Sequence, residues 1–292
     1  MSDKKEEGIE MSDKKEEGIE MSDNNEVAEK KATEVANVSV FEDDAGEGIV
    51  MGKHDVQLPR LKVMQANNLT AGRKSMPGIE VGDFFNDATL DFFSGSEGIR
   101  VIPCVYQRRF LRWESQRGTT PPVDEFLPEG PLPKTERDSS NFDIITHELD
   151  GSNCTNGDYL EETHNHYVLI LLPNGMTQMA CHSMKRTGLK PSRVWNSMVG
   201  SRVAEGKNGP FTPARYSHVY KLDTFERENK GQIWSQVNVS LDSSLIEDNR
   251  VDLYQLAKTF AAAILSGEVT VKHDGEEIPE VTSNINEGDV PF

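Results

Sequence analysis

The sequence lacks the features expected of a disulfide-bonded protein or of the common enzyme classes. Its 292 residues include only three cysteines, none in a CxxC pair. An odd number of isolated cysteines argues against a disulfide framework and fits a reducing compartment. No Walker A sequence, GxSxG or HExxH motif is present. Since the acidic residues of the body are also scattered, we expect no enzymatic activity.

Long apolar runs are also missing. The longest candidates, residues 167–172 and the predicted helix near Ala261, are shorter than the roughly 20 residues that cross a bilayer as a helix. The N-terminus is charged and does not resemble a secretion signal. We therefore expect a soluble cytoplasmic protein without a membrane partner.

Acidic charge dominates the chain but is unevenly distributed. The formal net charge is −18. Residues 1–50 hold 16 acidic and 6 basic groups, and residues 268–292 hold 7 acidic and 1 basic. Residues 51–267 keep the remaining 26 acidic and 24 basic groups, so a nearly neutral body lies between acidic ends.

This charge distribution matches three expected regions. The decapeptide MSDKKEEGIE occurs twice at the start of the chain, and a repeat this polar cannot bury a core. We expect residues 1–52 to form a disordered acidic tail. Residues 53–267 should form one domain, and residues 268–292 a second flexible acidic tail.

Alternating apolar residues and turn signals predict mostly antiparallel strands. The expected strands cover residues 58–64, 81–85, 90–93, 99–113, 166–172, 176–184, 215–222 and 232–241. A Pro-Asn-Gly turn at 173–175 joins two of them. The prolines between residues 115 and 140 predict a long surface loop.

Two helices are expected after these strands, at residues 190–199 and 250–265. The first should present Val194, Trp195, Met198 and Val199 on one face. Gly267 is placed to end the second. Together, strands and helices predict an α+β, mainly antiparallel, barrel-like fold.

Aromatic and arginine residues alternate along the strand predicted at residues 99–113. Period-two alternation places on one face Tyr106, Arg108, Phe110 and Arg112. The other face holds Val101, Pro103, Val105, Leu111 and Trp113, interrupted by Gln107 and Arg109. Bases can stack on such rings while arginines neutralise phosphates. We predict a single-strand groove here that also includes Arg100 and Arg109; the alternative is core aromatics with solvated arginines.

A second basic segment leads into the first predicted helix. Its cations are Lys185, Arg186, Lys190 and Arg193. Because backbone amides at a helix start favour phosphate, this segment is predicted to form the second wall of the groove. The alternative is a solvated charged face.

Histidines and cysteines leave a zinc site geometrically conceivable. The candidates are His147, Cys154, His164, His166, Cys181 and His182. Nothing in their spacing requires a metal. We therefore predict neither a metal nor another cofactor. The sequence leaves open whether these side chains bind a metal.

The chain ends in Glu287-Gly288-Asp289-Val290-Pro291-Phe292. This ending resembles the acidic tip of bacterial and phage single-stranded-DNA-binding proteins, over about six residues and with Gly288 interrupting the acids. The resemblance implies that Phe292, stiffened by Pro291 and preceded by Val290, enters an apolar pocket on a replication or recombination protein. It also implies that Glu287 and Asp289 contact a basic rim.

The body, from Leu58 to the helix ending near Gly267, resembles a family of uncharacterised bacteriophage proteins. Together the resemblances imply a non-catalytic phage protein that coats single-stranded DNA in the cytoplasm of the infected host. They imply an elaborated OB-like barrel with two helices. The alternative is a virion structural or assembly protein with solubilising acidic tails. An oligomer is possible, and a preference for DNA over RNA is left open.

Overall fold

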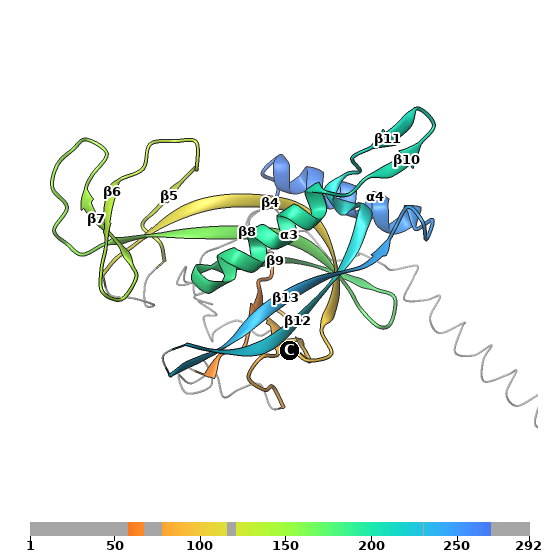
Figure 1. Cartoon of the computed structure of the whole chain (residues 1–292), viewed down its shortest axis with the longest axis horizontal. Helices are drawn as coiled ribbons and strands as arrows, with labels where there is room; N and C mark the ends of the chain where they lie inside the picture. The colour runs from red at the N-terminus through yellow and green to blue at the C-terminus, as the bar shows by residue number, and fades with distance from the viewer. Residues whose placement is uncertain (1–57, 67–77, 116–120, 230, 270–292) are drawn as a thin grey trace, which may run out of the picture. The chain divides into compact units, whose positions relative to one another are not determined.

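The computed structural model describes residues 58–66, 78–115, 121–229 and 231–269 (Figure 1). The predicted N-terminal tail and nearly all of the predicted C-terminal tail lie outside these residues. So does the partner-binding tip, Glu287, Asp289, Val290, Pro291 and Phe292. No helix of the described residues is long and apolar enough to cross a membrane.

Two long antiparallel strands, β4 (Ile99–Trp113) and β8 (Tyr159–Leu171), form the centre of an eight-stranded sheet. At one end of this pair, β12 (His218–Asn229) lies beside β4 and β9 (Thr177–Lys185) lies beside β8. At the other end, β5 (Asp124–Phe126) lies beside β4 and β7 (Asp143–His147) lies beside β8. The sheet continues through β13 (Gln232–Ser244) next to β12 and β6 (Lys134–Arg137) next to β7.

Smaller elements complete the described chain. A three-stranded sheet contains β1 (Leu61–Val63), β2 (Phe84–Asn86) and β3 (Phe92–Phe93), and a short hairpin contains β10 (Ala204–Gly206) and β11 (Gly209–Phe211). The helices are η1 (Arg186–Gly188), α3 (Leu189–Gly200), η2 (Arg215–Ser217) and α4 (Val251–Leu265).

The two long helices pack on opposite sides of the central strands. On one side, Phe260 and Ile264 of α4 join Ile102 and Val105 of β4 in one buried cluster. On the other side, Trp195 of α3 is fully buried in a second cluster that draws on both larger sheets. Pro191 lies in the first turn of α3, where the missing N–H costs no helical hydrogen bond. The sheet thus separates an α3 side from an α4 side.

A bulge in β4 corrects the predicted alternation of this strand. Pro103 pairs with Val168 and Val105 pairs with Tyr167, so Cys104 is an extra residue. An extra residue reverses which side the following side chains occupy. Val101 therefore packs on the α3 side and Val105 on the α4 side. The prediction that Val101 and Val105 lie on the same apolar face of this strand is therefore wrong.

The mostly antiparallel α+β class is confirmed. The described strands form open sheets, and no ladder among them closes a barrel, so the OB-like barrel is not shown. The prediction of one long loop between residues 115 and 140 is wrong, because this segment contains β5 and β6. Both are short edge strands, and the prolines lie outside them. Val194 is 47% exposed and does not share the buried face of Trp195.

Candidate nucleic-acid interface

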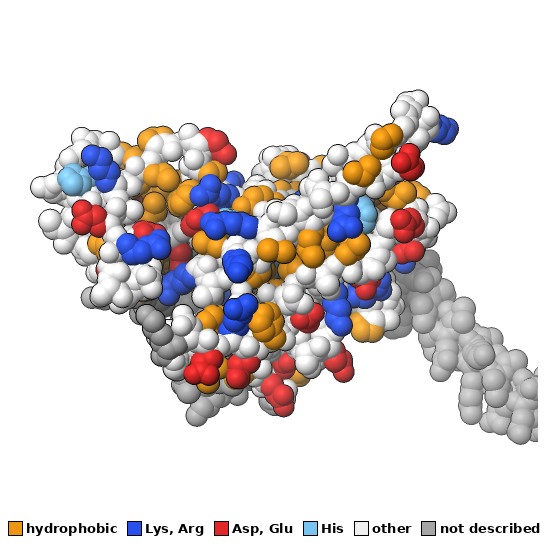
Figure 2. Space-filling view, in the orientation of Figure 1, with side chains coloured by type: hydrophobic (Ala, Val, Ile, Leu, Met, Phe, Trp, Pro, Cys, Tyr) orange, Lys and Arg blue, Asp and Glu red, His pale blue; other side chains and the backbone are white. Residues whose placement is uncertain are grey.

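Some of the predicted interface residues lie at the N-terminal half of α3 and the neighbouring part of β4, namely Tyr106, Arg108, Lys190 and Arg193. Figure 2 shows Lys and Arg side chains in a broken row across the face that carries α3, with Asp and Glu side chains among them. The chemistry of this face depends on how many of these cations are already neutralised by a carboxylate.

Two carboxylates of β8 each pair with two predicted cations. The Glu162 Oε1 atom lies 2.8 Å from Arg108 Nε and 3.6 Å from Arg193 Nη2. The Glu161 carboxylate lies 2.9 Å from Lys185 Nζ and 3.0 Å from Arg186 Nε. Each group therefore keeps one positive charge in excess.

Other predicted cations are paired elsewhere or have no partner. Arg100 lies 2.7 Å from Asp242, and Arg109 Nε lies 2.6 Å from Glu125. Arg109 is on the α4 side, so it does not share a face with Arg108. Within the described ranges, Lys190 is exposed and has no ion pair.

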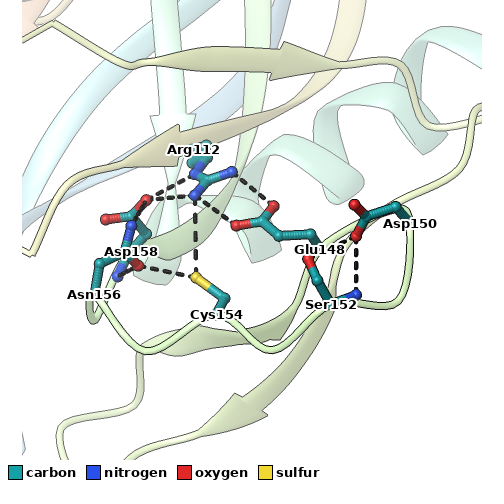
Figure 3. A network of polar contacts seen from close by, with 7 residues as sticks. All are labelled: Arg112, Glu148, Asp150, Ser152, Cys154, Asn156 and Asp158. Atoms are coloured by element: carbon teal, nitrogen blue, oxygen red, sulfur yellow. Dashed lines mark hydrogen bonds and ion pairs between the residues drawn. The ribbon is translucent and has the colours of Figure 1, made fainter.

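Arg112 is the centre of a polar network that holds the turn before β8 against β4 (Figure 3). Its Nε donates to Asp158 Oδ2 at 2.8 Å, and its two terminal nitrogens donate to the Glu148 carboxylate at 2.9 Å. Asn156 Nδ2 donates to the same Asp158 oxygen at 2.9 Å. Hydrogen bonds to both carboxylates raise the pKa of Arg112, although burial opposes this. Its guanidinium therefore has a structural role.

The two predicted stacking rings differ in their surroundings. Tyr106 is half-buried, and its ring centroid lies 5.3 Å from that of His164 and 5.1 Å from that of His166. Arg108 lies over the ring of Phe110 at 4.9 Å. Tyr106 is thus part of an aromatic cluster, and Phe110 already has a cation over its ring.

The structure adds Arg215, which sequence reasoning missed. Its Nη1 donates to Asn196 Oδ1 at 2.9 Å and its Nη2 to His166 Nδ1 at 3.0 Å, while its buried Nε has no partner. Burial lowers the pKa of Arg215 to about 10, so it stays cationic at neutral pH. Among the described residues it forms no ion pair with a carboxylate. Its position at the start of a predicted strand gave no signal of this role.

A directional hydrogen-bond chain connects Arg215 to Glu162. Since His166 Nδ1 accepts from Arg215, its Nε2 carries the proton and donates to Ser192 Oγ at 2.7 Å. The Ser192 hydroxyl then donates to His164 Nδ1 at 2.7 Å, and His164 Nε2 donates to Glu162 Oε1 at 2.9 Å. Burial lowers the pKa of both histidines, in keeping with neutral rings.

The histidines and cysteines considered as zinc ligands are not brought together in one site. In the part of the chain that the structure describes, no group of three or more His, Cys, Asp or Glu side chains is placed to hold a metal. His164 and His166 bind Ser192, whereas His182 Nδ1 lies 2.8 Å from the carbonyl oxygen of Leu61.

The fold and this face define a mostly antiparallel α+β protein with a basic, partly aromatic surface around α3. The model of the Pam3 phage gp34-like protein family matches residues 24–270, and the chain belongs to that family. No curated protein and no solved structure matches the chain. The expected link to bacteriophage proteins is thereby confirmed, whereas binding of single-stranded DNA stays a prediction.

Proposed function

We propose that the chain binds single-stranded DNA on the face that carries α3, as a non-catalytic component of phage replication or recombination. The observation that carries the proposal is the local excess of positive charge. On this face Glu162 pairs with two cations, Arg108 and Arg193, and Arg215 and Lys190 have no carboxylate partner among the described residues. Such an excess attracts phosphates even on a chain that is acidic overall.

Binding would be centred on phosphates more than on stacked bases. Arg108 and Arg193 share one carboxylate oxygen, so either can turn toward a phosphate while the other keeps Glu162 paired. Arg215 lies behind them, connected through Ser192 and His164 to the same carboxylate. A phosphate here would meet guanidinium groups from β4, α3 and η2.

Fluorescence anisotropy with a labelled single-stranded oligonucleotide, measured over a salt series, tests the proposal. The double variant Lys190→Met/Arg193→Met removes two exposed cations, and each lost phosphate contact should reduce the salt slope by about 0.7. Arg137→Met is the control, because Arg137 is an exposed arginine paired with Asp143 on β7. An unchanged slope in the double variant would remove α3 from the interface.

A virion structural or assembly role is the second candidate. The observation that favours it is the pairing of every predicted cation except Lys190 with a carboxylate. Together with a nearly neutral body, such pairing is typical of a surface without a nucleic-acid ligand. No oligonucleotide binding at low salt, with the protein present in purified phage particles, would favour this role.

A further inference from the structure

The hairpin of β12 and β13 continues beyond the central strands of the large sheet. β12 pairs with β4 only through Tyr220, Lys221 and Leu222, whereas its pairing with β13 extends as far as Asn229. Figure 1 shows this part of the hairpin standing apart from β4 and β8. We call residues 223–229 and 231–238 the β12–β13 arm.

One face of the β12–β13 arm is fixed to the turns that flank β2 and β3. The Thr224 N–H donates to the Gly95 carbonyl oxygen at 2.8 Å, and Thr224 Oγ1 donates to the Gly82 carbonyl oxygen at 2.7 Å. The side-chain amide of Gln65 accepts from the Ser235 N–H and donates to the Ser235 carbonyl oxygen, each at 2.9 Å. These bonds determine which face of the arm is left uncovered by the turns.

The opposite face of the arm carries two aromatic rings and a guanidinium group. Period-two alternation places Phe225 and Arg227 of β12 on this face, and Arg227 pairs directly with Trp234 of β13. The Arg227 Cζ atom lies 5.4 Å from the centroid of the Phe225 ring. Phe225 is 42% exposed and Trp234 is partly exposed, whereas Trp113 and Trp195 are buried. The two rings are therefore within reach of a ligand.

The charge of this face is positive. Arg227 is exposed and forms no ion pair with a carboxylate in the described part of the chain. Its neighbours Glu226 and Glu228 alternate onto the other face of the arm. By contrast, Arg108 and Arg112 of β4 are already paired with carboxylates. The arm thus has the uncommitted guanidinium between rings that β4 lacks.

The edge of the arm lies beside the start of α3. Gln236 is the direct cross-strand partner of Phe225, and its Nε2 atom donates to the Thr187 carbonyl oxygen at 3.2 Å. Thr187 belongs to η1, which leads directly into α3. A strand held by Lys190 and Arg193 of α3 can therefore continue over this edge toward the rings of the arm.

We propose that Phe225, Arg227 and Trp234 form the base-stacking part of the single-strand interface. Unpaired bases stack on the two rings, and Arg227 neutralises a phosphate between them. Such stacking tolerates any base sequence and requires bases that are not already paired in a duplex. The inference rests on the proposed function, because the cations of α3 supply the phosphate contacts of the same strand.

Anisotropy titrations of the full chain with a labelled oligo(dT) strand, and with an abasic strand of equal length, test this inference. Phe225→Ala should weaken oligo(dT) binding by about fivefold or more. It should not change binding of the abasic strand, which keeps the phosphates and lacks the bases. Equal oligo(dT) affinity of Phe225→Ala and the unchanged protein would overturn the inference.

Ile233→Ala is the matched control for Phe225→Ala. Ile233 is a 59% exposed apolar side chain of the same hairpin, and it lies on the opposite face from Trp234. Its replacement removes a similar amount of exposed apolar surface, so it should leave the affinity for both strands unchanged. An equal loss of oligo(dT) affinity in both variants would count against a specific stacking face.

Tryptophan fluorescence gives a second readout. Since Trp113 and Trp195 are buried, Trp234 is the tryptophan that a base can reach. Addition of oligo(dT) should quench the emission, and the quench should be lost in Trp234→Phe, which keeps an aromatic ring. A quench of unchanged size in Trp234→Phe would overturn the assignment of Trp234.

The two proposals can fail separately. Equal binding of oligo(dT) and the abasic strand, with a salt slope that falls in Lys190→Met/Arg193→Met, would leave the α3 interface standing and overturn stacking on the arm. Weaker oligo(dT) binding in Phe225→Ala, with an unchanged slope in the double variant, would do the reverse. If Phe225→Ala abolishes self-association in sedimentation experiments and keeps the strand affinity, the face binds a second copy of the chain and the inference fails.

Discussion

Ser192 of α3 lies 2.7 Å from the Nδ1 atom of His164 on β8, and its hydroxyl also accepts from His166. The three side chains are all buried. One hydroxyl thus satisfies two imidazoles and ties the helix to the central strand.

Replacing Ser192 with alanine should destabilise the protein. The change leaves two buried ring nitrogens without a partner, at a cost of about 1–3 kcal/mol for each unsatisfied group. Ser197→Ala on the same helix is the control, because Ser197 is exposed and bonds only to the Arg193 carbonyl oxygen. Urea denaturation should show a lower midpoint for Ser192→Ala alone. Equal midpoints would contradict the hydrogen-bond chain.

Stability should fall on acidification below about pH 6.5. Burial lowers the pKa of His164, His166, His182 and His218 from the ordinary value of 6.5. Below pH 6.5 the unfolded chain binds more protons than the folded one. The contribution of these histidines to stability is therefore fully present above pH 6.5 and is lost as the pH falls below it. Each such histidine contributes a slope of up to about 1.4 kcal/mol per pH unit.

Denaturation midpoints at pH 7.5, 6.5 and 5.5 measure this effect. His166→Gln keeps an acceptor for Arg215 and a donor for Ser192 but cannot be protonated. The slope of its unfolding free energy against pH should therefore be smaller by the contribution of one proton. The depressed pKa of Glu162 acts only below its ordinary value of 4.5, outside this window. An identical slope in the variant would show that His166 does not titrate on unfolding.

Arg112→Met should destabilise the protein without changing DNA binding. Asp158 is almost fully buried and would lose its guanidinium partner, which costs about 3 kcal/mol for a buried carboxylate. Arg137→Met breaks only the exposed pair with Asp143 and should leave the unfolding midpoint unchanged. Because Arg112 is already bound to carboxylates, its loss should also leave the salt slope of DNA binding unchanged. A reduced slope would place it at the interface.

The bounds of β4 and of both long helices could be predicted because each depends on a local pattern. The strand predicted at residues 99–113 matches β4, and α4 buries Leu253, Ala257 and Phe260 at helical spacing before ending near Gly267. In contrast, the bulge at Cys104 has no local signal, because it becomes visible only in the pairing with β8.

The candidate site depended on long-range register, which the sequence does not display. Arg108 meets Glu162 and Arg112 meets Asp158 because β4 and β8 pair in one register. The alternating arginines in the sequence therefore did not distinguish exposed guanidinium groups from those that are held by carboxylates. Arg215 was missed for the same reason, since its partners Asn196 and His166 come from α3 and β8.

Removing Asp289 to Phe292 should leave DNA affinity unchanged or raise it slightly, while capture of replication or recombination proteins is lost. An acidic segment tethered to the same chain competes with DNA at a high effective concentration, and shortening it weakens that competition.

Phe292→Ala separates the two effects, because it keeps every acidic group and removes only the expected anchor. It should abolish capture in a pull-down with purified partners and leave anisotropy titrations unchanged. Deletion of one MSDKKEEGIE copy is the control for loss of acidic residues elsewhere, and it should preserve capture. Weaker DNA binding after removal of the last four residues would contradict competition, since it would mean that the tip contributes to the interface.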